Sequence, residues 1–336
     1  MKTVRLLSLF FALMMFTTVS AKEKLVNGVA YVELNNGAWM PRFGLGTFNV
    51  PDNATCKNAV LTALRLGYRH IDTAHAYMDE QGVGDAIAQF IKESGVKREE
   101  IWVTSKLWPT EYGDPTAVDR MLTRLHLDYL NLVYLHQPVG DVKAGWHNLE
   151  AAARAGKVRT LGISNFEVKG AESLYRWCVD STSIRPAVIQ MECHPYAQRV
   201  AERAQAVKDG MVVESWFPLG GAVSNGALFR DPVIQQIAQS HHSTPAQVII
   251  AWHLQEGLSA IPGATDHGYI TENLNANNIK LSKEEMTLLR GLNKEQRFYP
   301  YDIEVTRSFC SRPLPDSADN AQWQQQMNDE LNKNNH

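Results

Sequence analysis

The chain has 336 residues, of which 44% are hydrophobic, and its 33 basic and 36 acidic side chains give a formal net charge of -3. This length suffices for one large α/β barrel or for two ordinary domains, so length alone leaves the number of domains open. The nearly balanced charge provides no basic stripe for nucleic acid or anionic lipid, and a small molecule is therefore the expected partner.

The N-terminal segment differs from the rest of the chain. Lys2 and Arg5 precede a mostly apolar run over residues 6–19, and residues 19–21 have the small-residue form of a cleavage site. The apolar run is shorter than the ~20 residues that a membrane-spanning helix needs. We predict a signal peptide over residues 1–21 and an exported protein without stable membrane insertion after cleavage. A retained membrane anchor is the open alternative.

A tight hairpin is expected soon after the signal peptide. Leu34-Asn35-Asn36-Gly37 lies between Val32 and Trp39, and Asn-Gly is the strongest short signal for a two-residue turn between strands. This pattern predicts an N-terminal β-hairpin that plugs the fold that follows.

From residue 43 onward, short apolar or β-branched runs alternate with amphipathic segments. The predicted strands are Phe43–Gly46, Arg69–Asp72, Ile101–Lys106, Asn131–His136, Thr160–Ser164, Val188–Glu192, Val212–Trp216 and Ser259–Ile261. Segments with helical spacing separate them, for example residues 58–66, 84–91, 117–125 and 146–155, and these are long enough to connect parallel strands. Further helices are expected after the capping boxes at Thr244 and Ser282.

The regular alternation of strand and helix predicts an α/β fold, and eight repeats favour a closed (β/α)8 TIM barrel over an open sheet. We place this barrel at residues 22–305 and a polar C-terminal tail at residues 306–336, which are rich in Gln, Asn and Asp toward their end. The chain contains no G-x-G-x-x-G, Walker, H-E-x-x-H or G-x-S-x-G motif, so dinucleotide-fold, nucleotide hydrolase, zincin and α/β-hydrolase hypotheses lack support.

Three successive predicted strands end in polar side chains: Asp72, then Lys106, then His136, and Tyr77 lies five residues into the loop after the first of these strands. A barrel places its chemistry at these strand ends, so the four side chains are expected to meet at one rim. An ammonium group near Tyr77 can lower the pKa of the phenol by roughly one to three units. Asp72 can pair with Lys106, and His136 can donate a hydrogen bond to a carbonyl oxygen. The group fits general-acid reduction of C=O, although each residue alone is more simply a cap, a surface charge or a packing group.

The sequence resembles the aldo-keto reductase family, and bacterial 2,5-diketo-D-gluconate reductase-like members in particular, from Leu34 to about Tyr301. The matching stretches occur in family order: Met40-Pro41, Gly44-Leu45-Gly46-Thr47, Ile71-Asp72-Thr73-Ala74, Thr104-Ser105-Lys106-Leu107-Trp108, Leu135-His136-Gln137-Pro138, Gly162-Ile163-Ser164-Asn165-Phe166 and Gln190-Met191-Glu192-Cys193-His194-Pro195-Tyr196.

The resemblance implies a role for each matching position. Tyr77 would be the acid, tuned by Lys106 and Asp72, with His136 orienting the substrate. The implied cofactor-binding residues are Gly46, Thr47, Phe48, Ser164, Asn165, Gln190, Trp216, Pro218, Leu219, Gly263, Ala264, Tyr269, Glu272 and Asn273. Ser164, Asn165 and Gln190 would hold the nicotinamide carboxamide, and Trp216 would stack under the ring. Phe48, Trp108, Gln137 and His136 would line the substrate pocket, where Gln137 replaces a common aromatic residue.

The pattern departs from the family after the last strand. The family usually has Ile-Pro-Lys-Ser and then an Arg, which hold the 2′-phosphate of NADP, whereas this chain has Gly263 and Ala264 and later Tyr269. Asp266 would repel a phosphate and could accept a hydrogen bond from a ribose hydroxyl. NAD(P)H is the expected cofactor and NADPH the family default, but these replacements indicate a preference for NADH or weak cofactor binding.

The leading functional hypothesis is a monomeric reductase of aldehydes or ketones, with small keto-sugars or 2,5-diketo-gluconate-like compounds as candidate substrates. The alternative is an exported nucleotide-binding barrel that acts as a sensor or subunit without significant turnover, since nicotinamide cofactors are not expected outside the cytoplasm. No metal is expected, because His70, His75 and His194 do not share a ligand spacing. The four cysteines are far apart, and their spacing leaves their pairing open.

Overall fold

The computed structural model describes residues 22–26, 28–299 and 302–315, together with residues 322, 323, 325, 326 and 329. The predicted signal peptide at residues 1–21 lies outside the described residues. The strands are β1 Glu23–Val26, β2 Val29–Glu33, β3 Trp39–Pro41, β4 Leu45–Gly46, β5 His70–Asp72, β6 Trp102–Leu107, β7 Leu130–Leu135, β8 Val158–Ser164, β9 Val188–Glu192, β10 Val212–Trp216 and β11 Ser259–Ala260.

The α-helices are α1 Asn53–Leu66, α2 Glu80–Ser94, α3 Ala117–Leu125, α4 Val142–Arg154, α5 Glu172–Asp180, α6 Val200–Lys208, α7 Pro232–Ser240, α8 Pro245–Gln255, α9 His267–Asn275, α10 Lys283–Arg290 and α11 Ile303–Cys310. Short 3-10 helices are η1 His75–Tyr77, η2 Arg98–Glu100, η3 Pro109–Glu111, η4 Ala222–Ser224, η5 Leu228–Arg230 and η6 Ala276–Asn278. The predicted capping box of Thr244 with Gln247 is present at the start of α8, and that of Ser282 with Glu285 at the start of α10.

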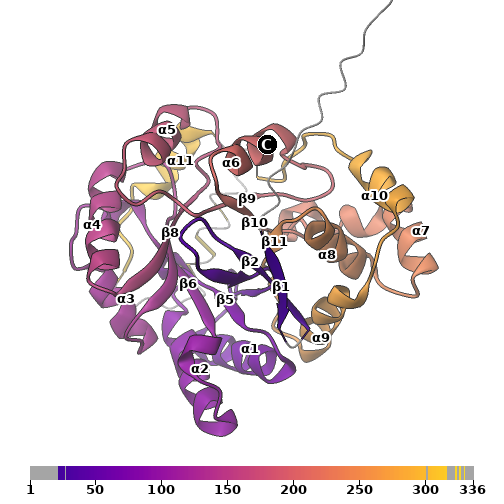
Figure 1. Ribbon diagram of the computed structural model, residues 1–336, viewed down its shortest axis with the longest axis horizontal. Coiled ribbons are helices and arrows are strands. Elements are labelled where there is room, and N and C mark those ends of the chain that lie inside the picture. Colours follow the sequence, from indigo (N-terminus) through magenta and orange to yellow (C-terminus); the bar gives the residue numbers. More distant parts are fainter. Residues whose placement is uncertain are drawn as a thin grey trace, which may run out of the picture.

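The core is a parallel sheet with the strand order β4 to β11, each strand paired with its neighbour in sequence. Parallel bridges between Phe43 and Ala260 and between Gly46 and Gly263 join the first strand to the last. The sheet is therefore closed, and the helices surround it (Figure 1). This confirms the predicted (β/α)8 barrel, including each of the predicted strands.

A three-stranded antiparallel sheet of β1, β2 and β3 covers one end of the barrel (Figure 1). Its side chains Val32 and Met40 are fully buried in a cluster with Trp102, Leu132 and Tyr134, which come from barrel strands. The predicted turn at Gly37 connects β2 to β3, with φ 81° at the glycine, a value that glycine adopts at little cost. This sheet forms an apolar floor, and strand β1 adds to the hairpin that the sequence predicts.

The C-terminal segment departs from the expected polar tail. The boundary predicted at residue 305 falls inside α11, which begins after an Asp302 cap and buries Thr306 and Cys310. Farther along, the indole of Trp323 donates a hydrogen bond to the carbonyl oxygen of Ala76 at 2.7 Å. The composition of this segment is polar, but the described side chains Phe309, Cys310, Leu314 and Trp323 have partners on the barrel.

All four cysteines are buried and unpaired. Within the described part of the chain, no helix is both long enough and apolar enough to cross a membrane.

Candidate active site

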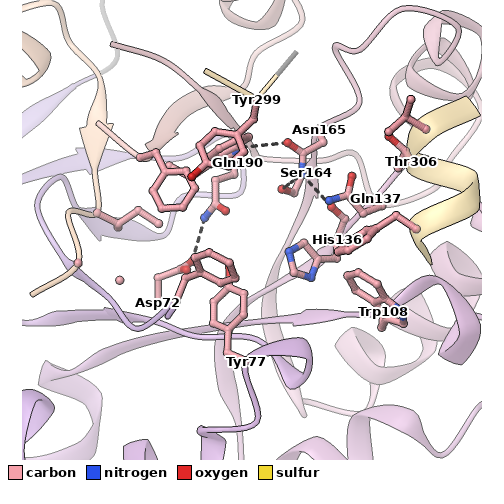
Figure 2. Close-up of a pocket in the computed structure, with 18 residues that line it drawn as sticks. Asp72, Tyr77, Trp108, His136, Gln137, Ser164, Asn165, Gln190, Tyr299 and Thr306 are labelled. Atoms are coloured by element: carbon pink, nitrogen blue, oxygen red, sulfur yellow. Dashed lines mark hydrogen bonds between the residues drawn. The ribbon is translucent and has the colours of Figure 1, made fainter. Parts of the chain in front are cut away.

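A pocket opens at the carboxyl ends of the barrel strands, on the side opposite the floor. The predicted site residues that line it are Gly46, Phe48, Asp72, Tyr77, Trp108, His136, Gln137, Ser164, Asn165, Gln190, Trp216 and Gly263 (Figure 2). These residues lie in or just after different strands, and closure of the barrel brings them together.

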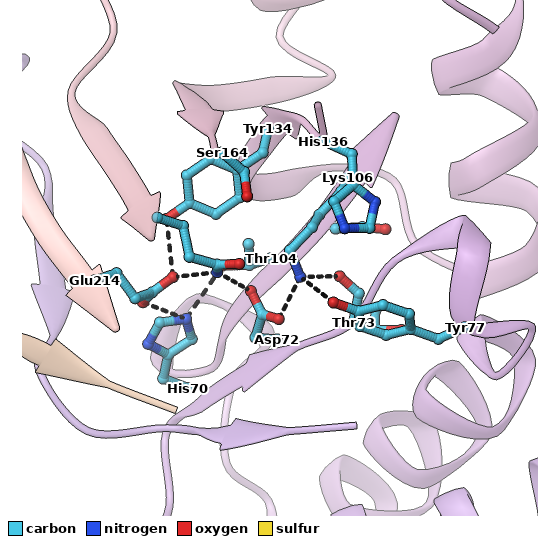
Figure 3. A network of polar contacts seen from close by, with 12 residues as sticks. His70, Asp72, Thr73, Tyr77, Thr104, Lys106, Tyr134, His136, Ser164 and Glu214 are labelled. Carbon is cyan, nitrogen blue, oxygen red and sulfur yellow. Dashed lines mark hydrogen bonds and ion pairs between the residues drawn. The ribbon is translucent and has the colours of Figure 1, made fainter. Parts of the chain in front are cut away.

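Lys106 lies beneath the pocket and is fully buried. Its Nζ donates hydrogen bonds to a carboxylate oxygen of Asp72, to the carbonyl oxygen of Thr73 at 3.0 Å and to the hydroxyl of Tyr77 at 3.1 Å (Figure 3). These acceptors use all three ammonium protons, which satisfies a charge that would otherwise be costly to bury. The predicted cluster of acid, lysine and carboxylate is therefore assembled.

The effect of this cluster on Tyr77 differs from the expected lowering. Burial raises the pKa of Tyr77 to about 12, although the ammonium of Lys106 opposes this rise. Burial disfavours the charge of Lys106 as well, but the contact with Asp72 outweighs it and raises the pKa of the ammonium. Tyr77 is consequently held as a neutral phenol, and its hydroxyl lies next to a fixed positive charge.

His136 faces the same part of the pocket. Burial, reinforced by Lys106, holds the pKa of its imidazole well below 6.5, so the ring is neutral. Trp108 and Tyr77 pack against it with their ring centroids at 5.3 and 5.8 Å. Its Nδ1 is buried without a hydrogen-bond partner among the described residues. A neutral imidazole held in place this way can donate one hydrogen bond to a carbonyl oxygen.

The side chain of Asn165 lines the pocket and makes three hydrogen bonds to neighbouring residues. Its Nδ2 donates to the carbonyl oxygen of His136 at 3.1 Å and to the Ser164 hydroxyl at 3.0 Å. Its Oδ1 accepts from the indole of Trp216 at 2.9 Å. Asn165 thus fixes Ser164 and Trp216, and a left-handed φ of 65° allows it to do so, a conformation in which Asn is favoured over most residues.

An aromatic pair that the sequence did not single out forms one side of the pocket. Phe217 and Tyr299 both line it, and their rings stack with centroids 4.7 Å apart. Phe217 has φ 44°, which is an unfavourable conformation for a bulky side chain and is typical of functional sites. The sequence could have drawn attention to Phe217, because the resembled family has Ser at this position. No sequence pattern singled out Tyr299.

Helix α11 supplies a second wall that the sequence did not predict. Val305, Thr306 and Phe309 line the pocket, and the ring of Phe309 packs against Trp108 at 5.7 Å. The Trp108 indole donates to the carbonyl oxygen of Arg312 at 3.2 Å. The predicted substrate residue Trp108 therefore also anchors the C-terminal segment.

Several predicted cofactor residues do not line this pocket. They are Thr47, Pro218, Leu219, Ala264, Tyr269, Glu272 and Asn273. Near them, the carboxylate of Asp266 caps α9 by accepting from the backbone N–H groups of Gly268 at 2.8 Å and Tyr269 at 3.2 Å. An anion at this helix terminus would use the same donors. Tyr269 is 63% exposed and brings no positive charge.

Comparison with known proteins identifies the protein family of this chain. The model of the Aldo/keto reductase family matches residues 34–294. The chain belongs to the aldo/keto reductase family. It is 40% identical over 278 residues to glyoxal reductase of Bacillus subtilis, covering 82% of this chain and 96% of the relative. It is 36% identical to a methylglyoxal reductase of Yersinia pestis over 82% of this chain and 96% of that protein.

Solved structures agree with this assignment. An aldo/keto reductase from Brucella melitensis superimposes with a TM-score of 0.72 at 31% identity and covers 79% of this chain and 99% of its own. An aldose reductase from Schistosoma japonicum gives a TM-score of 0.73 at 31% identity, covering 80% of this chain and 93% of its own. The chain is therefore an NAD(P)H-dependent carbonyl reductase. The named relatives are reductases, so the alternative of a sensor without turnover has no support.

The pocket suits the nicotinamide end of the family's cofactor. The Trp216 ring offers a flat apolar face beside Ser164 and Gln190, and a side chain at Gly46 would collide with the carbonyl oxygen of Ile261 at 2.7 Å. The bare backbone at Gly46 keeps this part of the cleft open. At the residues expected to face the other end of the cofactor, Asp266 and Tyr269 contribute a carboxylate and an exposed phenol and bring no positive charge.

Bound NAD(P)H supplies the hydride for carbonyl reduction. The arrangement can serve the remaining steps chemically: an imidazole such as His136 can hold a carbonyl oxygen, and a phenol such as Tyr77, beside Lys106, can give that oxygen a proton as negative charge develops on it. Aromatic side chains of Phe48, Trp108 and Phe217 line the pocket beside these groups.

Proposed function

We propose that this reductase acts on small polar aldehydes and ketones, with Tyr77 as the proton donor and with Lys106, Asp72 and His136 in the roles described above. The observation that carries the proposal is the hydrogen bond from the fully buried Lys106 ammonium to the Tyr77 hydroxyl at 3.1 Å, at the base of the pocket. The adjacent positive charge stabilises negative charge as the phenolic proton is transferred.

Gln137 supports the polar character of the substrate. Its side chain is 6% exposed and lines the pocket, and its Oε1 is buried without a hydrogen-bond partner among the described residues. An unpaired buried amide oxygen favours a substrate that brings a hydrogen-bond donor, such as a hydroxyl, near the reacting carbonyl. Hydroxycarbonyl compounds have such a donor. Two similar proteins are named for the small carbonyl compounds glyoxal and methylglyoxal.

The substrate proposal is tested by following cofactor absorbance with matched carbonyl compounds. Glycolaldehyde, which carries a hydroxyl, should be reduced with higher kcat/KM than acetaldehyde or propanal of similar size, and the hydroxyls of 2,5-diketo-gluconate should give it the same advantage. Gln137→Leu should remove this preference and leave the rate with propanal nearly unchanged. A preference that survives in Gln137→Leu would assign it to other residues.

The cofactor proposal is that NADH binds at least as tightly as NADPH. Gly263, Ala264 and Tyr269 stand where the family has Lys, Ser and Arg, and the carboxylate of Asp266 occupies the α9 N-terminus. A phosphate there would meet a like charge and lack ligands. Dissociation constants of both cofactors, measured by quenching of Trp fluorescence, test this directly, and clearly tighter NADPH binding would refute it.

We also propose that the protein is exported and monomeric. Export is supported by Lys2 and Arg5, by the apolar run over residues 6–19 and by the cleavage site at residues 19–21. N-terminal sequencing of protein recovered from the exported fraction should begin at Lys22, and retention of Met1 would contradict cleavage. Light scattering on the mature chain should give the mass of one copy.

A further inference from the structure

A second buried carboxyl group lies deeper in the barrel than Asp72. Glu214 in β10 is fully buried, and its Oε2 accepts hydrogen bonds from the Tyr134 hydroxyl at 2.8 Å and from Nε2 of Gln190 at 2.7 Å. The same Nε2 donates to Oδ2 of Asp72 at 2.9 Å. One amide nitrogen therefore links Glu214 to the carboxylate that pairs with Lys106 (Figure 3).

The charges in this network do not balance if both carboxyls are ionised. Asp72 and Glu214 would carry two negative charges, and Lys106 supplies one positive charge. The other titratable groups facing Glu214 or Asp72 are the phenols of Tyr77 and Tyr134, whose pKa values burial raises, and the imidazole of His70. An uncompensated charge in the centre of a barrel is costly, so the network requires one more proton.

His70 is a poor holder of that proton. Its Nδ1 lies 3.1 Å from the carbonyl oxygen of Pro41 and its Nε2 lies 3.1 Å from the Thr104 hydroxyl. A neutral ring satisfies both contacts, with Nδ1 as the donor and Nε2 as the acceptor. Burial also lowers the pKa of His70 to about 4.

The two carboxyls differ in their contacts. Asp72 touches the Lys106 ammonium, whereas the hydrogen-bond donors to Glu214 are neutral. Oε1 of Glu214 has no hydrogen-bond partner among the described residues, and Nε2 of His70 is 3.7 Å away from it. Burial raises the pKa of both carboxyls, and Lys106 opposes this rise mainly at Asp72. A proton on Oε1 of Glu214 thus restores neutrality at least cost.

We propose that Glu214 is a positioning residue that stays protonated, so that Asp72 is the ionised partner of Lys106 and Gln190 keeps Nε2 between the two carboxyls. Gln190 lines the pocket, and commitment of its nitrogen leaves its Oε1 to accept a hydrogen bond from a bound carboxamide. Glu214 acts through Gln190 and Asp72 and does not touch the substrate. The catalytic part of this inference rests on the proposed roles of Tyr77 and Lys106.

The protonation state is tested without cofactor or substrate. The infrared difference spectrum between the wild type and Glu214→Gln at neutral pH should contain a carboxylic-acid C=O band that the variant lacks. Tyr134→Phe removes one hydrogen bond to the same carboxyl and should shift this band without abolishing it. Absence of the band from the difference spectrum would overturn the proposal, whatever the activity of the enzyme.

The positioning role is tested by kinetics. In Glu214→Gln a neutral amide replaces a neutral acid, so the pH profile of kcat should coincide with those of the wild type and of Ser215→Ala, a control on the same strand. A displacement of more than about half a pH unit would mean that an ionised Glu214 had been removed and would overturn the proposal.

Glu214→Leu deletes the acceptor of Gln190, and the KM for the cofactor should rise about tenfold, which is the usual scale for a lost buried hydrogen bond. Rescue of KM in Glu214→Gln is expected, because an amide oxygen can still accept from Gln190. An unchanged KM in a folded Glu214→Leu protein would show that Gln190 needs no such partner. If Glu214→Leu does not fold, the Glu214→Gln measurements decide the matter. Loss of activity in Tyr77→Phe is independent of these outcomes, so failure of the proposed function would be seen separately.

Discussion

The two ends of the proposed cofactor site differ in how completely the chain satisfies its own polar groups. At the nicotinamide end, Lys106 is fully buried and each of its ammonium protons has an acceptor. At the adenosine end, Tyr269 is exposed and Asp266 places a carboxylate at the terminus of α9. The Lys106 cluster is buried and fully hydrogen-bonded, whereas the residues expected to distinguish the two cofactors lie on the surface.

This difference has a physical basis. A change in the buried cluster leaves a charge without its partner inside the barrel, which is strongly destabilising. Substitutions on an exposed helix terminus rarely alter stability by more than about 0.5 kcal/mol. Cofactor preference can therefore change without disturbing the reaction. The predictions below test this separation of chemistry from cofactor choice, beginning with the largest effect.

Removal of the proton donor should have the largest effect on the rate. Tyr77→Phe is expected to lower kcat about 10²- to 10⁴-fold, the range for loss of a general acid, while the dissociation constants of NADH and NADPH stay within about twofold. The measurement is steady-state reduction together with cofactor titration. Tyr175→Phe, which removes a hydroxyl bonded to Asp209 on the outside of the barrel, is the matched control and should retain full activity. Equal rates for wild type and Tyr77→Phe would end the assignment.

Breaking the buried ion pair should cost stability as well as rate. Lys106→Met leaves Asp72 as an unpaired charge, and the free energy of unfolding should fall by about 3–5 kcal/mol. Asp72→Asn combined with Lys106→Met removes both charges and should recover most of that loss, although not the activity. Denaturant unfolding of the single variants Lys106→Met and Asp72→Asn and of the double variant checks this coupling. Additive losses would show that the two groups do not act as a pair.

Returning a cation to the exposed end should change cofactor choice. Tyr269→Arg is expected to tighten NADPH binding about tenfold and leave NADH binding unchanged, because a charge-assisted contact to the 2′-phosphate is gained. Leu288→Arg adds the same charge at an exposed position in α10 and should not affect either cofactor. An equal gain for NADH would show that the effect is general attraction.

The smallest effect is expected from pH. The pKa of Tyr77 is raised to about 12 and that of His136 is held well below 6.5, so neither group changes its protonation near neutrality. The kcat for reduction should vary less than about twofold from pH 6.5 to 9 and fall only as the phenol loses its proton at higher pH. Saturating stopped-flow measurements test this. A fall in kcat as the pH rises through about 7 would mean that bound cofactor and substrate lower the pKa of Tyr77.

The barrel could be predicted almost completely from the sequence. Its strands are short, apolar and evenly spaced, and Asp72, Lys106 and His136 stand at the ends of predicted strands. One barrel topology explains both the spacing of the strands and the position of these polar residues. The direction of the pKa shift at Tyr77 could not be predicted in the same way. It depends on how fully the phenol is buried, and a sequence shows the presence of Lys106 but not the loss of solvent.

The pocket walls formed by the C-terminal part of the chain escaped prediction for a related reason. Tyr299 lies in a loop and Phe309 in helix α11, which the sequence did not predict, and their partners Phe217 and Trp108 are far away in sequence. The polar composition after residue 305 predicted a solvated tail, because composition averages over a few apolar side chains that have specific contacts. Glu214 was hidden among hydrophobic strand residues, where its hydrogen bonds to Tyr134 and Gln190 depend on closure of the barrel.

The apolar floor made by β2 and β3 affects the supply of protons to the reaction. Val32 and Met40 pack against Trp102 and Tyr134 beneath the polar network, which separates that network from bulk water at this end of the barrel. When cofactor and substrate fill the pocket, the opposite end is covered too. With Tyr77 as the proposed proton donor, we expect its reprotonation to follow the departure of product, so that a solvent isotope effect on multiple turnovers would report product departure as well as the chemical step.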